Sequence, residues 1–220
     1  MAPRLGVTPA RRRVSARYWV RAIRIPSGPA SSLHDRAIAW FGSGERQLLA
    51  ALPTVEDRRQ FAVARIEVRR MLSDATGVPS AAIRLGAAPS GRPSMWAGPG
   101  MPEIDFNIGH CEGHVVIGLA YEGRIGVDVA PVRRDVESLA ERVLLPDELR
   151  SLRALRPRRR PFEFARLWAV KEACVKACDL GLAALRSVHV GAGTSGRWGE
   201  VEWETLDLGR CVVGAVALAP

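Results

Sequence analysis

The stretch Phe164-Ala-Arg-Leu-Trp-Ala-Val-Lys-Glu-Ala-Cys-Val-Lys-Ala-Cys178 indicates most about this 220-residue chain. At 100° per residue it is predicted to form a helix whose apolar residues share one face, with Lys171 in the middle of that face. Lys171 and Lys176 are the only lysines, whereas the other 30 of the 32 basic residues are arginines. Glu172 and Lys176 on the flank could be an ordinary surface ion pair. A charge on an apolar face, however, needs a partner or a phosphate, so this helix is the first candidate site.

Outward from this helix, the predicted elements occur twice in the same order. The first half contains a strand at 16–25, helices at 43–52 and 55–75, and strands at 82–85, 104–108 and 114–120, with a long loop at 87–102. The second contains a strand at 124–130, helices at 136–143, 146–155 and 161–179, a basic loop at 156–160, and strands at 187–190, 198–206 and 210–219. This order predicts an α+β fold of two similar lobes, 16–122 and 123–220, each a small sheet packed against a long helix. A flexible basic arm is expected at 1–15.

The composition is that of a folded protein with an acidic partner. Hydrophobic residues make up 47% and charged residues 25%, and the formal net charge is +9. No run approaches the roughly 18 apolar residues of a membrane span. The basic start lacks the apolar segment of a secretory signal, so we expect a cytoplasmic protein with no membrane partner. The charge alone is compatible with nucleic acid, lipid, a phosphorylated small molecule or an acidic protein.

The segment Gly126-Val-Asp-Val-Ala130 is the second candidate site. An aspartate between apolar neighbours in a strand is costly unless it meets a cation, a metal or several donors. A lone Asp128 would more often form a local salt bridge, but here it opens the second sheet, where it could meet Glu172 from the helix. Two carboxylates with open water positions suit Mg²⁺, which shares its oxygen ligands with substrate phosphates.

The third candidate is the segment Phe106-Asn-Ile-Gly-His-Cys-Glu-Gly-His114 at a strand end. A zinc site of His110, Cys111 and His114 is disfavoured, because adjacent residues rarely chelate one ion and no fourth ligand is evident. We favour a phosphate contact by His110, with Gly109 letting a ligand approach the backbone.

Two further motifs are weaker. Ser90-Gly-Arg-Pro93 presents an arginine on a turn, and alone it indicates only a solvated loop. Gly191-Ala-Gly-Thr-Ser-Gly196 matches the dinucleotide fingerprint Gly-x-Gly-x-x-Gly, but a strand is predicted behind it. Without a helix N-terminus to meet a pyrophosphate, we interpret it as a hairpin loop.

Taken together, the motifs resemble those of the Sfp-type 4′-phosphopantetheinyl transferases. Gly-Arg-Pro at 91–93 stands where that family usually has Gly-Lys-Pro, and Phe-Asn-Ile-Gly-His at 106–110 where Phe-Asn-(Ile/Leu)-Ser-His is usual. Gly-Val-Asp-Val at 126–129 and Trp-Ala-Val-Lys-Glu-Ala-Cys-Val-Lys-Ala at 168–177 follow in the family's order. The resemblance covers roughly residues 45–182 and implies the family's pseudo-dimeric fold.

The resemblance implies Mg²⁺-dependent transfer of phosphopantetheine from coenzyme A (CoA) to a serine of an acyl or peptidyl carrier protein. Such carriers serve polyketide, non-ribosomal peptide, siderophore or fatty-acid synthesis. The metal ligands would be Asp128 and Glu172, with Glu172 also the base toward the serine. Lys171 and Lys176 would contact the CoA phosphates or stabilise charge in the transition state, and His110 and Arg92 would hold the 3′-phosphate and pyrophosphate. Further basic contacts to CoA are implied, on a looser alignment, for Arg46, Arg58 and Arg65. An acidic carrier and a monomeric enzyme are expected.

Two departures from the family's pattern concern the site. Ala130 stands where many members have a second acid, so water, Cys111 or Glu112 would have to complete the metal site. Gly109 replaces the usual serine and removes a hydroxyl. Two other classes compete with the transferase: a basic nucleic-acid-binding protein and a non-catalytic carrier binder. The aromatic residues are not interleaved with the basic runs, so no nucleic-acid partner is expected.

Overall fold

Helices and antiparallel sheets alternate along the chain, as the predicted α+β class requires. The computed structural model describes residues 10–12, 17–25, 39–88, 91–95 and 102–220. The first half contains β1 (Ala10–Arg12), β2 (Tyr18–Arg24), α2 (Ser43–Ala51), α3 (Val55–Thr76), β3 (Leu85–Ala87), β4 (Pro93–Met95), β5 (Asp105–Cys111) and β6 (His114–Ala120). The second contains β7 (Arg124–Pro131), α4 (Glu137–Val143), α5 (Pro146–Ala154), α6 (Arg160–Ala177), β8 (Ser195–Trp198), β9 (Val201–Asp207) and β10 (Val212–Ala219), with short 3₁₀ helices η1 (Pro157–Arg159) and η2 (Leu182–Ser187).

The first long helix, α3, covers a sheet of order β1-β2-β6-β5, which we call the N-terminal sheet. Thr54 caps its start by accepting the Asp57 amide at 3.0 Å, and Gly77 ends it in the left-handed conformation at φ 76°. Such caps satisfy amides and carbonyls that have no partner within the helix. Val68, Met71 and Leu72 are buried against the sheet at helical spacing.

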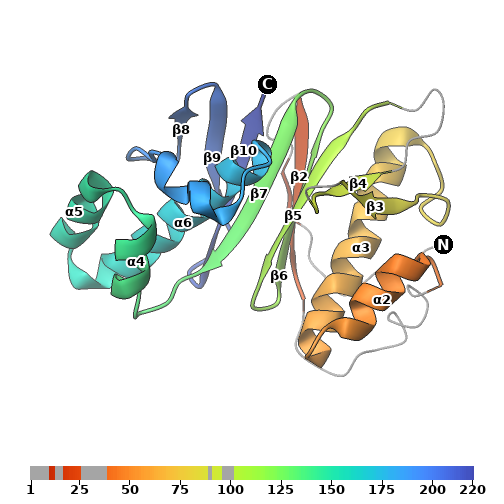
Figure 1. Ribbon diagram of the computed structural model, residues 1–220, viewed down its shortest axis with the longest axis horizontal. Coiled ribbons are helices and arrows are strands. Elements are labelled where there is room, and N and C mark those ends of the chain that lie inside the picture. Colours follow the sequence, from red (N-terminus) through yellow and green to blue (C-terminus); the bar gives the residue numbers. More distant parts are fainter. Residues whose placement is uncertain (1–9, 13–16, 26–38, 89–90, 96–101) are drawn as a thin grey trace.

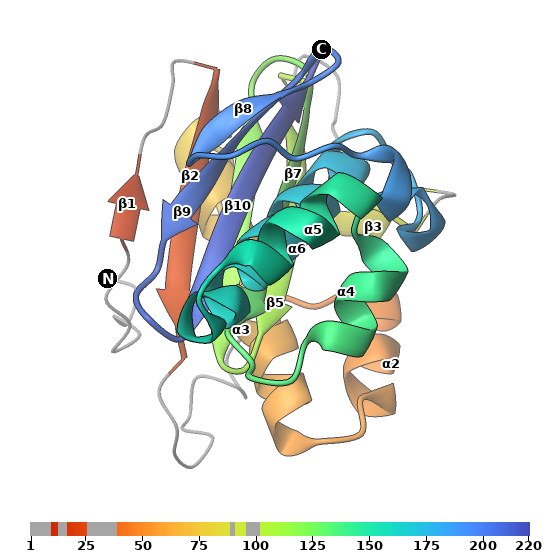
Figure 2. The same ribbon diagram turned by 90° about the vertical axis from the view of Figure 1, so that its left-hand side faces the viewer.

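The second long helix, α6, packs on β7 and β10 of a sheet of order β7-β10-β9-β8, the C-terminal sheet. From Phe164 to Ala177 almost every residue of α6 is buried, because the side away from the sheet is covered as well. Figure 2 shows α4 and α5 outside α6. A helix enclosed on both sides has no solvated face, so charged residues within it need internal partners.

A third apolar cluster joins the two sheets. Val20 and Val116 contribute from the N-terminal sheet, and Ile125, Val127 and Val129 from β7. The layers therefore run α3, N-terminal sheet, C-terminal sheet, α6, with β5 and β7 side by side at the centre (Figure 1). No helix within the described residues is long and apolar enough to cross a membrane.

Several predicted boundaries were wrong. Residues 187–190 form no strand: Ser187 ends η2, and the next three residues are irregular. The single strand expected at 198–206 is the end of β8, a turn at 199–200 and most of β9. The strand expected at 82–85 lies at β3, which pairs with β4 inside the expected loop 87–102; residues 89–90 and 96–101 of that loop lie outside the described residues. Of the expected arm, Ala10–Arg12 pairs with β2, and the rest is not described.

Candidate functional site

The two faces of β7 serve different purposes. Successive side chains of a strand point to opposite faces. Ile125, Val127 and Val129 belong to the cluster between the sheets, so Gly126, Asp128 and Ala130 are on the face that meets α6. A Cβ on Gly126 would lie 1.9 Å from the carbonyl oxygen of Ala173 in α6. Only glycine allows this approach, which brings Asp128 against the last two turns of α6.

Asp128, Lys176 and Glu172 form the cluster that we call the carboxylate cluster. The Lys176 Nζ lies 2.7 Å from Asp128 Oδ1 and 3.8 Å from Glu172 Oε2. It also donates to the carbonyl of Val127 at 3.4 Å. The carboxylate side chains are about nine-tenths buried, whereas that of Lys176 is 28% exposed. The expectation that Asp128 and Glu172 come together is therefore met, with Lys176 bridging them.

Burial sets the protonation chemistry of this cluster. Desolvation raises the pKa of Asp128, while the adjacent Lys176 ammonium opposes the rise. Desolvation also raises the pKa of Glu172, and the charge of Asp128 adds to the increase against the attraction of Lys176. A carboxylate with a raised pKa is a stronger base, as general-base catalysis near neutral pH requires.

The motif at 106–110 positions β5 beside the cluster. Asn107 Oδ1 accepts the Val127 amide at 3.2 Å, which ties β5 to β7. A Cβ on Gly109 would lie 2.7 Å from the Cα of Asp128, so here glycine admits the β7 backbone and not a ligand, contrary to our expectation. His110 is exposed at the end of β5, where desolvation and the Lys176 charge lower its pKa.

Arg92 lies close to the cluster but points into the protein. It forms an ion pair with Asp105 at 2.5 Å, and it donates to the carbonyls of Ile125 and Lys176. Its side chain is only 6% exposed. The expected CoA contact would have to replace these internal partners.

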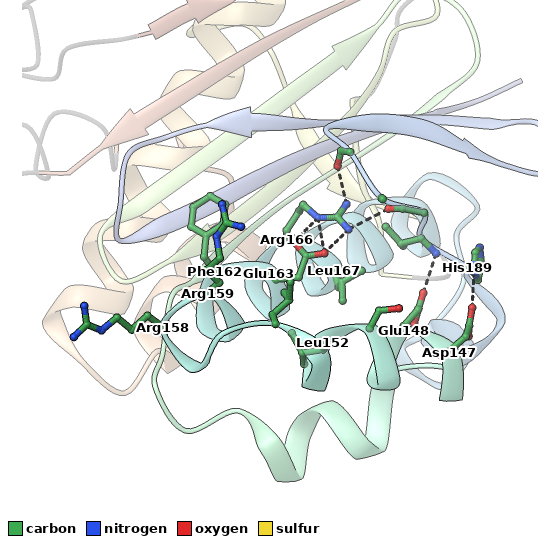
Figure 3. Close-up of a pocket in the computed structure, with 16 residues that line it drawn as sticks. Asp147, Glu148, Leu152, Arg158, Arg159, Phe162, Glu163, Arg166, Leu167 and His189 are labelled. Atoms are coloured by element: carbon green, nitrogen blue, oxygen red, sulfur yellow. Dashed lines mark hydrogen bonds and ion pairs between the residues drawn. The ribbon is translucent and has the colours of Figure 1, made fainter.

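Lys171 is not part of the carboxylate cluster. Its side chain is fully buried, with Nζ 2.8 Å from Glu148 Oε2 and within hydrogen-bonding distance of the carbonyls of Leu185 and Val188. Figure 3 shows Glu148 accepting from the chain at Val190, in a cavity of about 780 Å³ between α5 and α6. The expected role of Lys171 toward CoA phosphates is revised to a structural one, because the predicted apolar face is covered by α5 and η2.

The two lysines should therefore respond differently to the same substitution. Lys171→Met leaves the buried Glu148 carboxylate without its partner, and we expect the free energy of unfolding to fall by about 3–5 kcal/mol. Lys176→Met also leaves Asp128 without its cation, but the Lys176 side chain is 28% exposed where that of Lys171 is fully buried, so the loss should be smaller, about 1–2 kcal/mol. Urea denaturation of both variants measures the difference. Equal stability of the two would contradict the structural role of Lys171.

The three remaining arginines lie on the N-terminal helices. Arg46 donates to the carbonyl of Phe41 at 2.7 Å, and Arg58 to that of Leu52 at 2.7 Å. Arg65 stacks on Phe61 at 5.1 Å, and desolvation lowers its pKa. In the part of the chain that the structure describes, no hydrogen bond or ion pair joins any of them to the carboxylate cluster. Their contact with CoA stays a prediction.

The cluster offers two oxygen ligands for a divalent cation. Mg²⁺ commonly uses one or two carboxylates with water and substrate phosphates, so the donors Asp128 and Glu172 fit it chemically. Ala130, on the same face of β7, lies in the C-terminal core. Glu112 forms an exposed ion pair with Arg133 at 2.6 Å, and burial raises the pKa of the Cys111 thiol to about 12. Completion of the metal site by either residue, or by water, stays a prediction.

The disfavoured zinc site and the glycine motif at 191–196 gain no support from the structure. Among the described residues, no group of three or more His, Cys, Asp or Glu side chains could hold a metal ion. His110 and Cys111 alternate along β5, which separates their side chains to opposite faces. The segment 191–196 leads into β8 instead of a helix, and its Gly191 and Gly193 carbonyls accept from Arg166 (Figure 3).

One family model and several curated relatives match this chain. Residues 124–209 match the model of the 4′-phosphopantetheinyl transferase superfamily. The chain is 31% identical over 170 residues to the 4′-phosphopantetheinyl transferase HetI of Nostoc sp., covering 76% of this chain and 71% of HetI. It is 28% identical over 149 residues to ffp of Bacillus subtilis, covering 68% and 65%, and 29% identical over 175 residues to AcpT of Salmonella typhi, covering 79% and 86%. Both relatives are also named 4′-phosphopantetheinyl transferases.

Proposed function

Because the chain belongs to the 4′-phosphopantetheinyl transferase superfamily and is a transferase, we propose that it transfers 4′-phosphopantetheine from CoA to a carrier-protein serine with Mg²⁺. The observation that carries the proposal is the meeting of Asp128, Glu172 and Lys176 where β7 and α6 touch. Burial of the cluster raises the pKa of Asp128 and of Glu172. The Lys176 side chain is 28% exposed, so one side of the cluster is in contact with solvent.

The proposed step forms one phosphorus–oxygen bond and breaks another. The serine oxygen attacks the phosphorus that bears pantetheine, and the bond to the second phosphate breaks, releasing adenosine 3′,5′-bisphosphate. Glu172 accepts the serine proton, because it is the carboxylate of α6 that lies beside Lys176 and Asp128 in the cluster. Lys176 neutralises charge that develops on the phosphate oxygens, and His110, exposed beside it, contacts the same phosphates.

The donors support a two-carboxylate metal site. Asp128 and Glu172 would hold Mg²⁺, which when bound supplies positive charge to the pyrophosphate oxygens. Lys176 already neutralises Asp128, so the cation and the ammonium compete for that carboxylate until phosphates bring further negative charge. Chelation of divalent ions is expected to stop transfer without unfolding the protein.

Further features of the prediction belong to this proposal. We propose that the halves 16–122 and 123–220 are two related lobes of a pseudo-dimer, since each combines a long helix with an antiparallel sheet, three strands of the N-terminal sheet (β2, β6 and β5) in the first and all four of the C-terminal sheet in the second. The enzyme is further proposed to be cytoplasmic and monomeric. Its excess of arginine would attract an acidic carrier protein. These features await tests by carrier binding and by mass in solution.

One assay separates the transferase from its competitors. The protein is incubated with CoA, Mg²⁺ and several apo carrier proteins, and the intact mass of each carrier is measured. The proposal expects a gain of one phosphopantetheinyl group, absent when the acceptor serine is replaced by alanine. Carrier that is bound but unchanged in mass would indicate the non-catalytic binder.

A further inference from the structure

Arg92 is the arginine that the sequence resemblance assigns to CoA, yet its side chain turns inward and is buried. We propose that Arg92 is a positioning residue that, together with Asp105, fixes the end of α6 against the start of β7 and makes no contact with phosphate. The inference rests on the proposed function, because its principal measurement is transfer from CoA.

The guanidinium is committed to groups of the protein itself. Arg92 Nε lies 3.2 Å from Asp105 Oδ1 and Nη2 lies 2.5 Å from Asp105 Oδ2, which is the forked arrangement of an arginine and a carboxylate. Nη2 also donates to the Ile125 carbonyl at 2.5 Å, and Nη1 donates to the Lys176 carbonyl. These contacts occupy at least four of the roughly five donors of arginine.

The Arg92 and Asp105 pair holds both sides of the carboxylate cluster. Asp105 Oδ2 accepts the Ile125 amide at 2.7 Å, so the pair binds the amide and the carbonyl of the same residue. Ile125 is three residues before Asp128 on β7, and the bound carbonyl on α6 is that of Lys176 itself. One guanidinium thus sets the backbone distance across which Lys176 and Asp128 form their 2.7 Å bridge.

The backbone beside Arg92 is also tied down. Gly91 has a φ of 84°, which favours glycine, and the Arg92 carbonyl accepts the Ala88 amide at 2.8 Å directly before β4. A phosphate bound by Arg92 would displace the Asp105 carboxylate. That side chain is only 23% exposed, and it would be left without its cation. Lysine cannot replace the fork, because its ammonium is a single point charge.

The test compares two donors, CoA and dephospho-CoA, which lacks the 3′-phosphate. We expect Arg92→Lys and Arg92→Gln to lower kcat by about tenfold or more with both donors, since a buried carboxylate and two carbonyls lose their partner. The ratio of kcat/KM between the donors should stay within about twofold of wild type. The ratio does not depend on the folded fraction. A ratio that collapses toward one would overturn the proposal, because it would show that Arg92 contacts the 3′-phosphate.

Replacing Asp105 distinguishes a positioning role of Arg92 from a phosphate-binding role, because the two roles predict different effects on transfer. If Arg92 positions α6 against β7, Asp105→Asn should lower kcat as Arg92→Gln does, and the double variant should be little worse than either single one. If Arg92 instead serves phosphate, removing Asp105 would free it and leave or improve KM for CoA. Arg150→Gln, an exposed arginine of α5, is the matched control and should behave as wild type.

Hydrogen exchange decides the inference without any activity. The amides of Cys178 and Asp179 bond carbonyls at the end of α6, at 3.1 and 3.2 Å. In Arg92→Gln these amides should exchange about tenfold faster than in wild type, because the end of α6 loses its anchor. Unchanged exchange of these two amides would overturn the proposed positioning role of Arg92. An inactive wild type would refute only the proposed function.

Discussion

Glu172→Gln is expected to reduce phosphopantetheinyl transfer by at least about 10²-fold, the usual contribution of a positioned general base. The amide has nearly the same shape, but it accepts no proton and carries no charge for a metal. Asp128→Asn should show a loss of similar size, because it removes the other carboxylate and the partner of Lys176. Rates of carrier modification, read by mass, measure both losses. Glu200→Gln, an exposed carboxylate at the β8–β9 turn, is the control and should retain full activity.

Glu172→Gln should not destabilise the fold. The pKa of Glu172 is higher in the folded chain than its ordinary value of 4.5, so the folded form binds the proton more tightly. At neutral pH the charged form therefore disfavours folding, and the neutral amide removes that cost. In the absence of metal, the melting temperature of Glu172→Gln should equal or exceed that of wild type at pH 7. The difference should vanish on acidification below 4.5. A large loss of stability would mean that Glu172 is structural.

Gly126→Ala is expected to destabilise the protein by about 3 kcal/mol or more, at the upper end of overpacking effects. Its Cβ would lie 1.9 Å from the carbonyl oxygen of Ala173 and 2.5 Å from the amide nitrogen of Ala177. These are backbone atoms of α6, so no side chain can rotate away, and the whole helix must move off β7. Any protein that still folds should also lose activity, because Asp128 and Lys176 would separate.

The control for this substitution is Gly191→Ala. Nothing lies within 4 Å of a Cβ at that position, so the change should stay within about 0.5 kcal/mol. Urea denaturation of both variants makes the comparison. If Gly126→Ala were as stable as Gly191→Ala, the close approach of α6 to β7 would be refuted.

The order of the elements was predictable from the sequence because each signal is local. The apolar residues of α3 recur at helical spacing, Thr54 and Gly77 mark its ends, and the alternation around β7 is regular. Asp128 and Glu172 could also be proposed in advance, since a carboxylate in an apolar strand is costly. The strand expected at 187–190 failed because its buried valines pack under α6 in a segment without a strand partner.

The parts of the site that could not be predicted depend on partners from distant segments. Lys171 was assigned to CoA because a helix periodicity cannot reveal that Glu148 of α5 covers its face. An acid in the first turn of α5 was the only available signal, and in a sequence it indicates a helix cap, which Glu148 also provides by accepting the Leu145 amide. The internal partner of Arg92 was missed for the same reason, since Asp105 reaches it from another strand.

The most direct test of the account is a single-turnover measurement, with the enzyme in excess over an apo carrier and with CoA and Mg²⁺ present. The mass of the carrier is followed with time for wild type, Asp128→Asn, Glu172→Gln and Lys176→Met. The account predicts complete conversion by wild type and rates at least about 10²-fold lower for the three cluster variants. Conversion by these folded variants at the wild-type rate would contradict the claim that the contact between β7 and α6 is where transfer occurs.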